Sequence, residues 1–82
     1  MFELQYDGEG YYIVIEGLHN NRDKSISNEI GISLKKYHGI LKKFNAIPTY
    51  RNEHYLYNFD DAEKCCEYLN EKYGVLLKLM GV

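Results

Sequence analysis

The stretch DKSISNEIGISLKKYHGILK, residues 23–42, decides the fold of this chain. Its apolar residues recur at the spacing of an α-helix, and the pattern is broken once, at Gly31. Glycine adopts a left-handed backbone at low cost, so this position predicts a tight turn. Ser33 follows the turn and is a good N-cap, which predicts a second helix over residues 33–45.

The same stretch resembles the helix-turn-helix core of DNA-binding proteins. In that motif two helices meet at roughly 120° across a short turn. The crossing needs a small residue, where Ser27 stands, and the turn favours glycine, where Gly31 stands. Apolar residues plug the angle from both sides: Ile26, Ile30, Ile32, Tyr37 and Ile40. The alternative interpretation is an ordinary pair of amphipathic helices interrupted by a glycine.

The resemblance implies a DNA-binding surface on the second helix, which in this family enters the major groove. Lysines near its start can donate to guanine or to phosphate, and lysines near its end suit phosphates. The latter also offset the negative end of the helix dipole, which is an alternative reason for their presence. The expected DNA contacts are Ser33, Lys35, Lys36, His38, Lys42, Lys43 and, beyond this helix, Arg51.

The residues after residue 45 extend the resemblance to the winged helices of excisionases and MerR-type regulators. A polar segment around Arg51 lies between β-prone residues and predicts a short hairpin within residues 50–59. A helix start with acidic residues follows at Asp60-Asp61-Ala62. In this family such a hairpin is a wing, which implies that Arg51 contacts a phosphate or the minor groove.

The C-terminal third predicts a helix and then a strand. Asp60 and Glu63 have the spacing of a capping box, and Gly74 is placed to end the helix. An apolar stripe runs along the helix through Ala62, Cys65, Cys66, Leu69 and Tyr73. Residues 75–80 are strand-sized and apolar, so we expect a strand beside the N-terminal hairpin, with a continued helix as the alternative.

The N-terminal residues predict a β-hairpin. Residues 2–6 alternate between apolar and polar, residues 11–15 are aromatic or β-branched, and DGEG at residues 7–10 is a turn sequence. The expected fold class is therefore α+β. It comprises a helix-turn-helix with a wing hairpin and a third helix, plus the N-terminal hairpin joined by a C-terminal strand. A length of 82 residues suits a single domain over residues 1–82.

Charge and hydropathy narrow the function. The net charge is −2, yet residues 32–55 contain five Lys or Arg and a single acidic residue, Glu53. A local basic patch matters more for binding nucleic acid than the total charge. No stretch has the ~20 apolar residues of a membrane span, and the N-terminus lacks a signal-peptide pattern. The sequence predicts a cytoplasmic protein with no membrane partner.

The sequence gives no sign of catalysis, a metal or a cofactor. It lacks a Gly-rich phosphate loop, a nucleophile elbow and a paired-carboxylate signature. The adjacent Cys65 and Cys66 cannot form a disulfide framework, and the histidines lack finger-like spacing to them. We expect reduced, core-facing cysteines and exposed side chains at His38 and His54. The chain is predicted not to be an enzyme.

The leading hypothesis is a sequence-specific regulator or accessory factor that binds double-stranded DNA, acting as a homodimer in transcription regulation. The alternative is a small phage- or plasmid-type module that reuses the scaffold to bind and inhibit a host protein. Its contact surfaces would be the acidic hairpin and the apolar tail, residues 76–82. RNA binding through exposed tyrosines is a third possibility.

Overall fold

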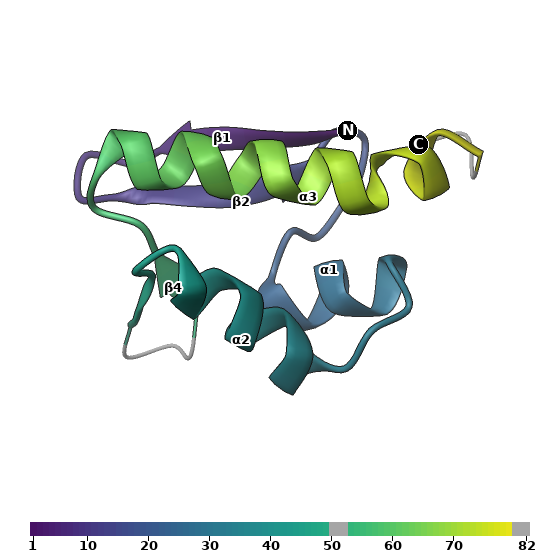
Figure 1. Cartoon of the computed structure of the whole chain (residues 1–82), viewed down its shortest axis with the longest axis horizontal. Helices are drawn as coiled ribbons and strands as arrows, with labels where there is room; N and C mark the ends of the chain where they lie inside the picture. Colours follow the sequence, from purple (N-terminus) through teal and green to yellow (C-terminus); the bar gives the residue numbers. More distant parts are fainter. Residues whose placement is uncertain (50–52, 80–82) are drawn as a thin grey trace.

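The computed structural model describes the backbone of residues 1–49 and 53–79 and the side chains of residues 1–49 and 53–74. Two layers are visible in Figure 1. In the upper layer α3 runs along the hairpin of β1 and β2, and the lower layer contains α1, α2 and β4. The fold is therefore α+β, with a β-hairpin and three helices. Its elements are, in order, β1 (Phe2–Tyr6), β2 (Tyr11–Ile15), α1 (Asp23–Glu29), α2 (Leu34–Lys43), β3 (Ile47–Pro48), β4 (His54–Tyr55) and α3 (Phe59–Leu79).

The predicted N-terminal hairpin is confirmed. β1 and β2 pair antiparallel, with Phe2 opposite Ile15 and Tyr6 opposite Tyr11. The turn is built by Asp7, whose Oδ1 accepts hydrogen bonds from the backbone N–H groups of residues 9 and 10 at 3.0 and 3.2 Å. Gly8 supplies the left-handed backbone of this turn, with φ of +96°.

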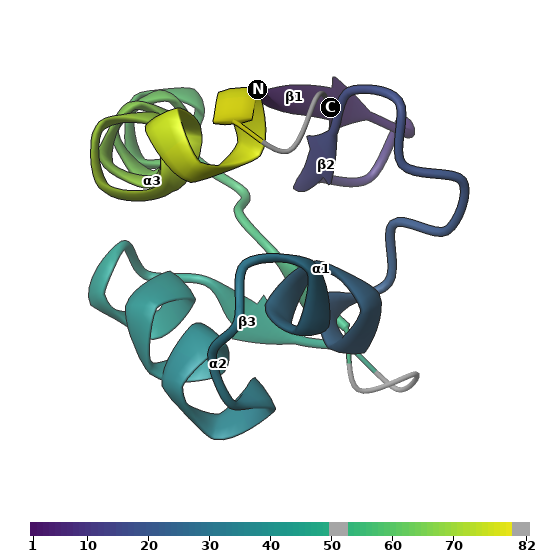
Figure 2. The ribbon, with the colours of Figure 1, turned by 90° about the vertical axis from the view of Figure 1, so that its right-hand side faces the viewer.

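Helix α3 covers the hairpin and confirms the predicted apolar stripe (Figure 2). Ala62, Cys65 and Leu69 have no solvent exposure. Asn70 then ties the helix to β1, because its side chain accepts from the N–H of Phe2 at 2.7 Å and donates to the C=O of Phe2 at 3.0 Å. This layer therefore combines buried apolar side chains with a satisfied polar contact at Asn70, while the buried hydroxyl of Tyr73 has no hydrogen-bond partner among the described residues.

Two predictions about the C-terminal third are wrong. Residues 75–79 continue α3 through Gly74 to Leu79, and among the described residues the N-terminal sheet has two strands. These residues are rich in leucine, which favours helix, and a glycine inside a helix costs only about 1 kcal/mol. The helix also begins earlier than Asp60: Asn58 caps it by accepting from the N–H of Asp61 at 3.2 Å.

The turn between α1 and α2 forms as predicted. Gly31 has φ of +75°, and the Oγ of Ser33 caps α2 by accepting from the N–H of Lys36 at 3.1 Å. Ser27 is buried where the two helices pack together, with 1% of its surface exposed. The second helix ends at Lys43, two residues before the predicted end at residue 45.

The second hairpin begins earlier than predicted. Its pairs are Ile47 with Tyr55 and Pro48 with His54, so its first strand precedes residue 50. The next residue after β4, Leu56, exchanges two backbone hydrogen bonds of 2.8 Å with Tyr11 of β2. This exchange joins the hairpin to the other layer. The predicted wing residue Arg51 lies outside the described residues.

A helix must be both long and apolar to cross a bilayer. Within residues 1–49 and 53–79, no helix combines these two properties.

Candidate functional site

The exposed side of α2 carries most of the predicted DNA contacts. Ser33, Lys35 and Lys36 are exposed at its N-terminal end, and Lys42 and Lys43 are exposed at its C-terminal end. The Ser33 side chain is already engaged in capping the helix. We call the surface formed by Lys35, Lys36, Gly39, Lys42 and Lys43 the basic face of α2.

The middle of this basic face is hollow. A shallow depression of about 440 Å³ is lined by Leu34, Lys35, His38, Gly39 and Lys42. A Cβ placed on Gly39 would have no atom within 4 Å, so packing inside the chain does not require glycine there. Since glycine weakens a helix interior, its presence at this exposed spot is left without a structural reason.

The other predicted contact on α2, His38, lines the depression with one part of its side chain, and its ring is bonded to α1. Its Nε2 lies 3.0 Å from Oδ2 of Asp23, the first residue of α1. The same oxygen is 3.2 Å from Nδ1 of His54 in β4 and accepts the backbone N–H of His54 at 3.2 Å. We call Asp23, His38 and His54 the polar cluster.

The polar cluster is largely hidden from solvent. The side chains of Asp23, His38 and His54 are 11%, 14% and 2% exposed. The rings of the two histidines lie against each other, with centroids 4.1 Å apart. The expectation that both histidines are exposed is therefore wrong, because each ring is drawn inward by a carboxylate that lies far away in the sequence.

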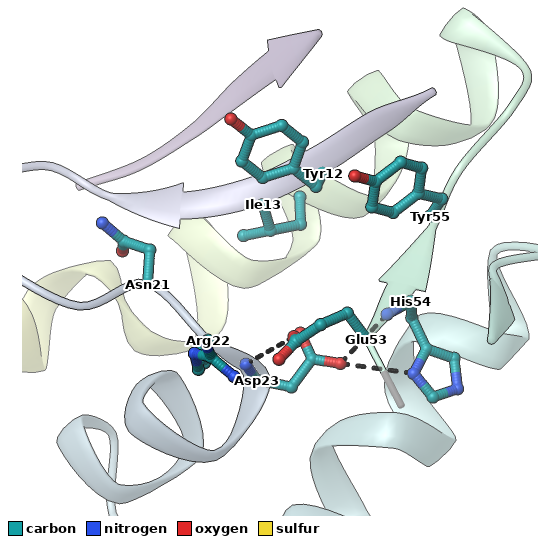
Figure 3. Close-up of a pocket in the computed structure, with 8 residues that line it drawn as sticks. All are labelled: Tyr12, Ile13, Asn21, Arg22, Asp23, Glu53, His54 and Tyr55. Carbon is teal, nitrogen blue, oxygen red and sulfur yellow. Dashed lines mark hydrogen bonds and ion pairs between the residues drawn. The ribbon is translucent and has the colours of Figure 1, made fainter. Parts of the chain in front are cut away.

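A second carboxylate lies beside the polar cluster. Oε2 of Glu53 accepts the backbone N–H of Asp23 at 2.9 Å, and Figure 3 shows the two carboxyl groups close together between α1 and β4. Burial, reinforced by the hydrogen bond and the charge of Glu53, raises the pKa of Asp23 to about 8. The cluster is thus poised to exchange a proton or to accept a positive charge.

The histidines respond in the opposite direction. Burial lowers the pKa of His38 and of His54, and the positive charge of Lys42 lowers both further. Both rings are therefore neutral at pH 7, which leaves a lone pair on one nitrogen of each ring. Neutral imidazole is the form that donates to metal ions.

The polar cluster borders an opening in the surface. A pocket of about 180 Å³ lies between α1, β2 and β4 (Figure 3). It is lined by Tyr12, Ile13, Asn21, Arg22, Asp23, Glu53, His54 and Tyr55. Water and small ions can therefore reach the carboxylates without unfolding of the chain.

Little in the sequence pointed to the polar cluster. Asp23 stands at a helix start, where an acidic residue is expected for local electrostatic reasons alone. Its partners lie 15 and 31 residues away, on α2 and on β4. The predicted absence of a metal site rested on the spacing of the cysteines, and the tertiary fold brings together a different set of residues.

Comparison with known proteins does not identify the function of this site. In comparisons with protein-family models, curated proteins and solved structures, nothing matches this chain. The basic face of α2 and the polar cluster are therefore interpreted from their own geometry and chemistry.

Proposed function

We propose that this chain is a regulator that binds double-stranded DNA, with α1, the Gly31 turn and α2 acting as a helix-turn-helix. In this proposal α2 is the recognition helix. The observation that carries it is the basic face of α2, which has four exposed lysines, two of which, Lys35 and Lys42, line the open space at Gly39. The absence of a side chain there allows a close approach of the DNA surface to the helix.

The distribution of charge supports the same assignment. Residues 32–55 contain five Lys or Arg against one acidic residue, although the whole chain has a net charge of −2. A polyanion that meets this face is attracted locally, while the acidic remainder of the chain is repelled. The charge thus favours one orientation of the chain on DNA.

The lysines have different expected roles. Lys35 and Lys36 follow the N-cap, at the end of a recognition helix that reads base edges, and donate to guanine or phosphate. Lys42 and Lys43 in the last turn are assigned to phosphates, a role compatible with their effect on the helix dipole. Different measurements test the two lysine pairs. The part of the DNA affinity that comes from phosphate contacts depends on salt, whereas the part that comes from base contacts also depends on the DNA sequence.

Titration of labelled random duplex DNA tests the proposal. Four phosphate contacts per chain give a slope of log affinity against log salt near −3.6, so affinity falls by about 100-fold between ~50 and ~200 mM salt. Replacing Lys35 and Lys36 by alanine should reduce this slope by about 2 and weaken binding at the lower salt. A homodimer on DNA would approximately double the wild-type slope.

The matched control removes two exposed lysines from α3, in the variant Lys64→Ala/Lys72→Ala. It changes the net charge equally but leaves the basic face of α2 intact, so its DNA affinity should stay close to wild type. Equal weakening by both double variants would show a non-specific charge effect and contradict the recognition-helix role.

A second candidate function is protein binding, as a module that uses an aromatic surface. Tyr6, Tyr57 and Phe59 are 59%, 53% and 50% exposed, and Tyr11 links the first and last of them through ring contacts of 4.9 and 5.5 Å. Exposed aromatic patches are typical of protein interfaces. Absence of DNA binding by folded protein at ~50 mM salt would favour this candidate.

A further inference from the structure

The polar cluster has the donor set and the spacing of a transition-metal site. It offers one carboxylate oxygen and one nitrogen from each of two imidazoles, and these atoms lie within 4.8 Å of one another. We propose that Asp23, His38 and His54 bind a divalent metal ion of the zinc type, with Glu53 or a water molecule as the fourth ligand. This site is independent of the proposed DNA binding.

The distances suit tetrahedral coordination. Zinc bonds to His nitrogen and carboxylate oxygen at about 2.0–2.2 Å, which places neighbouring ligand atoms of a tetrahedron ~3.3 Å apart. The Oδ2 of Asp23 is 3.0 Å from Nε2 of His38 and 3.2 Å from Nδ1 of His54. The two imidazole nitrogens lie within 4.8 Å of each other, so all three ligand atoms are close enough to converge on one ion after side-chain adjustment.

The charges around the cluster also favour a cation. Asp23 and Glu53 bring two carboxyl groups together in a poorly hydrated place, where Oε2 of Glu53 accepts the backbone N–H of Asp23 at 2.9 Å and the Asp23 side chain is 11% exposed. A divalent ion neutralises both carboxylates at once. Positive charges near the cluster include Lys42, which lines the depression on the basic face with His38, and Arg22, which lines the pocket with both carboxyl groups.

The protein alone leaves the cluster incompletely bonded. Nε2 of His54 is buried and has no hydrogen-bond partner among the described residues. Burying a polar group in this condition costs roughly 1–3 kcal/mol. Coordination through Nδ1 would place the ring proton on Nε2 and leave it without an acceptor among the described residues, so this atom is a cost that the metal bonds must outweigh.

The three proposed ligands come from three separate elements. Asp23 begins α1, His38 lies in α2, and His54 lies in β4, the second strand of the second hairpin. A bound ion would cross-link this half of the molecule and would couple metal binding to its folding. Loss of the ion would therefore loosen the contact between α2 and β4 before it affected the hairpin of β1 and β2.

The test is titration of the chelator-treated full chain with Zn²⁺ and, separately, with Co²⁺. We expect one ion per chain, a visible cobalt absorption typical of tetrahedral coordination, and a Tm raised by about 10 °C at a zinc concentration of 100 times Kd. Replacing a direct ligand in His38→Gln should weaken zinc binding by about 100-fold. His38 lies on a helix and is the most exposed ligand, so this change is the least disruptive of the three.

Two controls separate this site from other donors. His19→Gln removes an exposed histidine outside the cluster, and Cys66→Ser removes the half-buried thiol. Both should bind zinc as the wild type does. Absence of saturable zinc binding, or affinity equally unaffected by His38→Gln, would overturn the proposal.

A measurement on the wild-type chain covers the case in which a variant fails to fold. Zinc should shift the ring signals of His38 and His54 in NMR spectra and leave those of His19 in place. Movement of the His19 signals alone would place the ion elsewhere and contradict the site. None of these readouts requires DNA, so the failure of the DNA proposal would leave the metal proposal standing, and the reverse also holds.

Discussion

The two layers of the molecule share one apolar core but differ in the titratable side chains that they bury. The layer of β1, β2 and α3 buries mainly apolar groups such as Phe2, Cys65 and Leu69, and its polar side chain Asn70 is bonded to the backbone of Phe2. The layer of α1, α2 and β4 buries the carboxyl group of Asp23 and the ring of His54. The first arrangement stabilises a fold at low cost, whereas the second loses stability unless its polar groups are satisfied.

This difference indicates where function lies. The buried carboxyl group of Asp23, the buried ring of His54, a helix-interior glycine on an open surface and the lysines of the basic face all occur in the layer of α1, α2 and β4. Each of them is unfavourable or neutral for folding. Residues that weaken a fold are commonest at functional sites, where another requirement outweighs stability. Both proposals therefore involve this layer.

The largest change in the free energy of unfolding is expected for a substitution in the layer of β1, β2 and α3. Leu69→Ala removes a fully buried side chain from the interface of α3 with the hairpin and leaves a cavity. The free energy of unfolding should fall by about 2–5 kcal/mol, measured by urea denaturation. Glu71→Ala, at an exposed position of the same helix, should change it by no more than about 0.5 kcal/mol.

The DNA affinity of Leu69→Ala tests whether the layer of β1, β2 and α3 contributes to function as well as to stability. At a temperature where Leu69→Ala is still folded, its affinity for DNA should match that of the wild type, because the basic face of α2 is unchanged. A loss of DNA binding by this folded variant would mean that α3 and the hairpin take part in function, and the contrast between the layers would fail.

A substitution at Gly39 is expected to change the free energy of unfolding by less, and to raise it. Gly39→Ala should raise the free energy of unfolding by about 0.5–1 kcal/mol, because alanine favours helix and nothing lies within 4 Å of the new methyl group. If DNA approaches closely at this position, the same change should weaken DNA binding. Thermal unfolding and the DNA titration, carried out on one preparation, measure both.

The matched control is Gly74→Ala in α3. Among the described side chains, a Cβ there meets Asn70 at ordinary contact distances of 3.7 and 3.8 Å, so this change should also stabilise the chain. It lies in the other layer and should leave DNA affinity unchanged. Undiminished DNA binding by Gly39→Ala would mean that the glycine is a tolerated weakness and that DNA does not contact it.

Local patterns predicted the parts of the fold that depend on neighbours in sequence. Gly31 needs a left-handed backbone, Ser33 caps the helix it precedes, and Asp7 organises its own turn, so each could be inferred within a few residues. The stripe along α3 was equally readable, since it follows the helical period. The basic face of α2 was predicted in the same way, apart from His38.

Contacts between distant residues could not be inferred in this way. The burial of His54 depends on Asp23, which is 31 residues away, and no local signal relates the two. The apolar residues after Gly74 fit either a strand or a helix by pattern, and the continuation of α3 decided between them. Asn58 displaced Asp60 as the cap because α3 begins one residue earlier than the acidic pair suggested.

The smallest effect is expected at the junction of the two layers. The hydroxyl of Tyr55 in β4 donates to Oδ2 of Asp7 in the turn of the N-terminal hairpin. This hydrogen bond lowers the pKa of Asp7 from its ordinary 3.8 and raises the pKa of Tyr55 to about 12. Both groups are exposed, so the contribution to stability is small and is best detected through its pH dependence.

The sign of the pH dependence follows from the two shifts. The contribution of Asp7 is present above pH 3.8 and is lost as the pH falls through the lower pKa of the folded chain. The contribution of Tyr55 is present below pH 10 and is lost as the pH rises through about 12. Tyr55→Phe should therefore flatten the decline in stability at both extremes, as measured by urea denaturation across the pH range.

Tyr57→Phe is the control for this junction, because it removes a neighbouring exposed hydroxyl whose ring lies 6.1 Å from that of Tyr55. It should keep the wild-type pH profile. An unchanged profile in Tyr55→Phe would mean that this side-chain bond does not hold the layers together in solution. The backbone exchange between Tyr11 and Leu56 would then be the hydrogen-bonded link that aligns β4, and with it His54, against the hairpin.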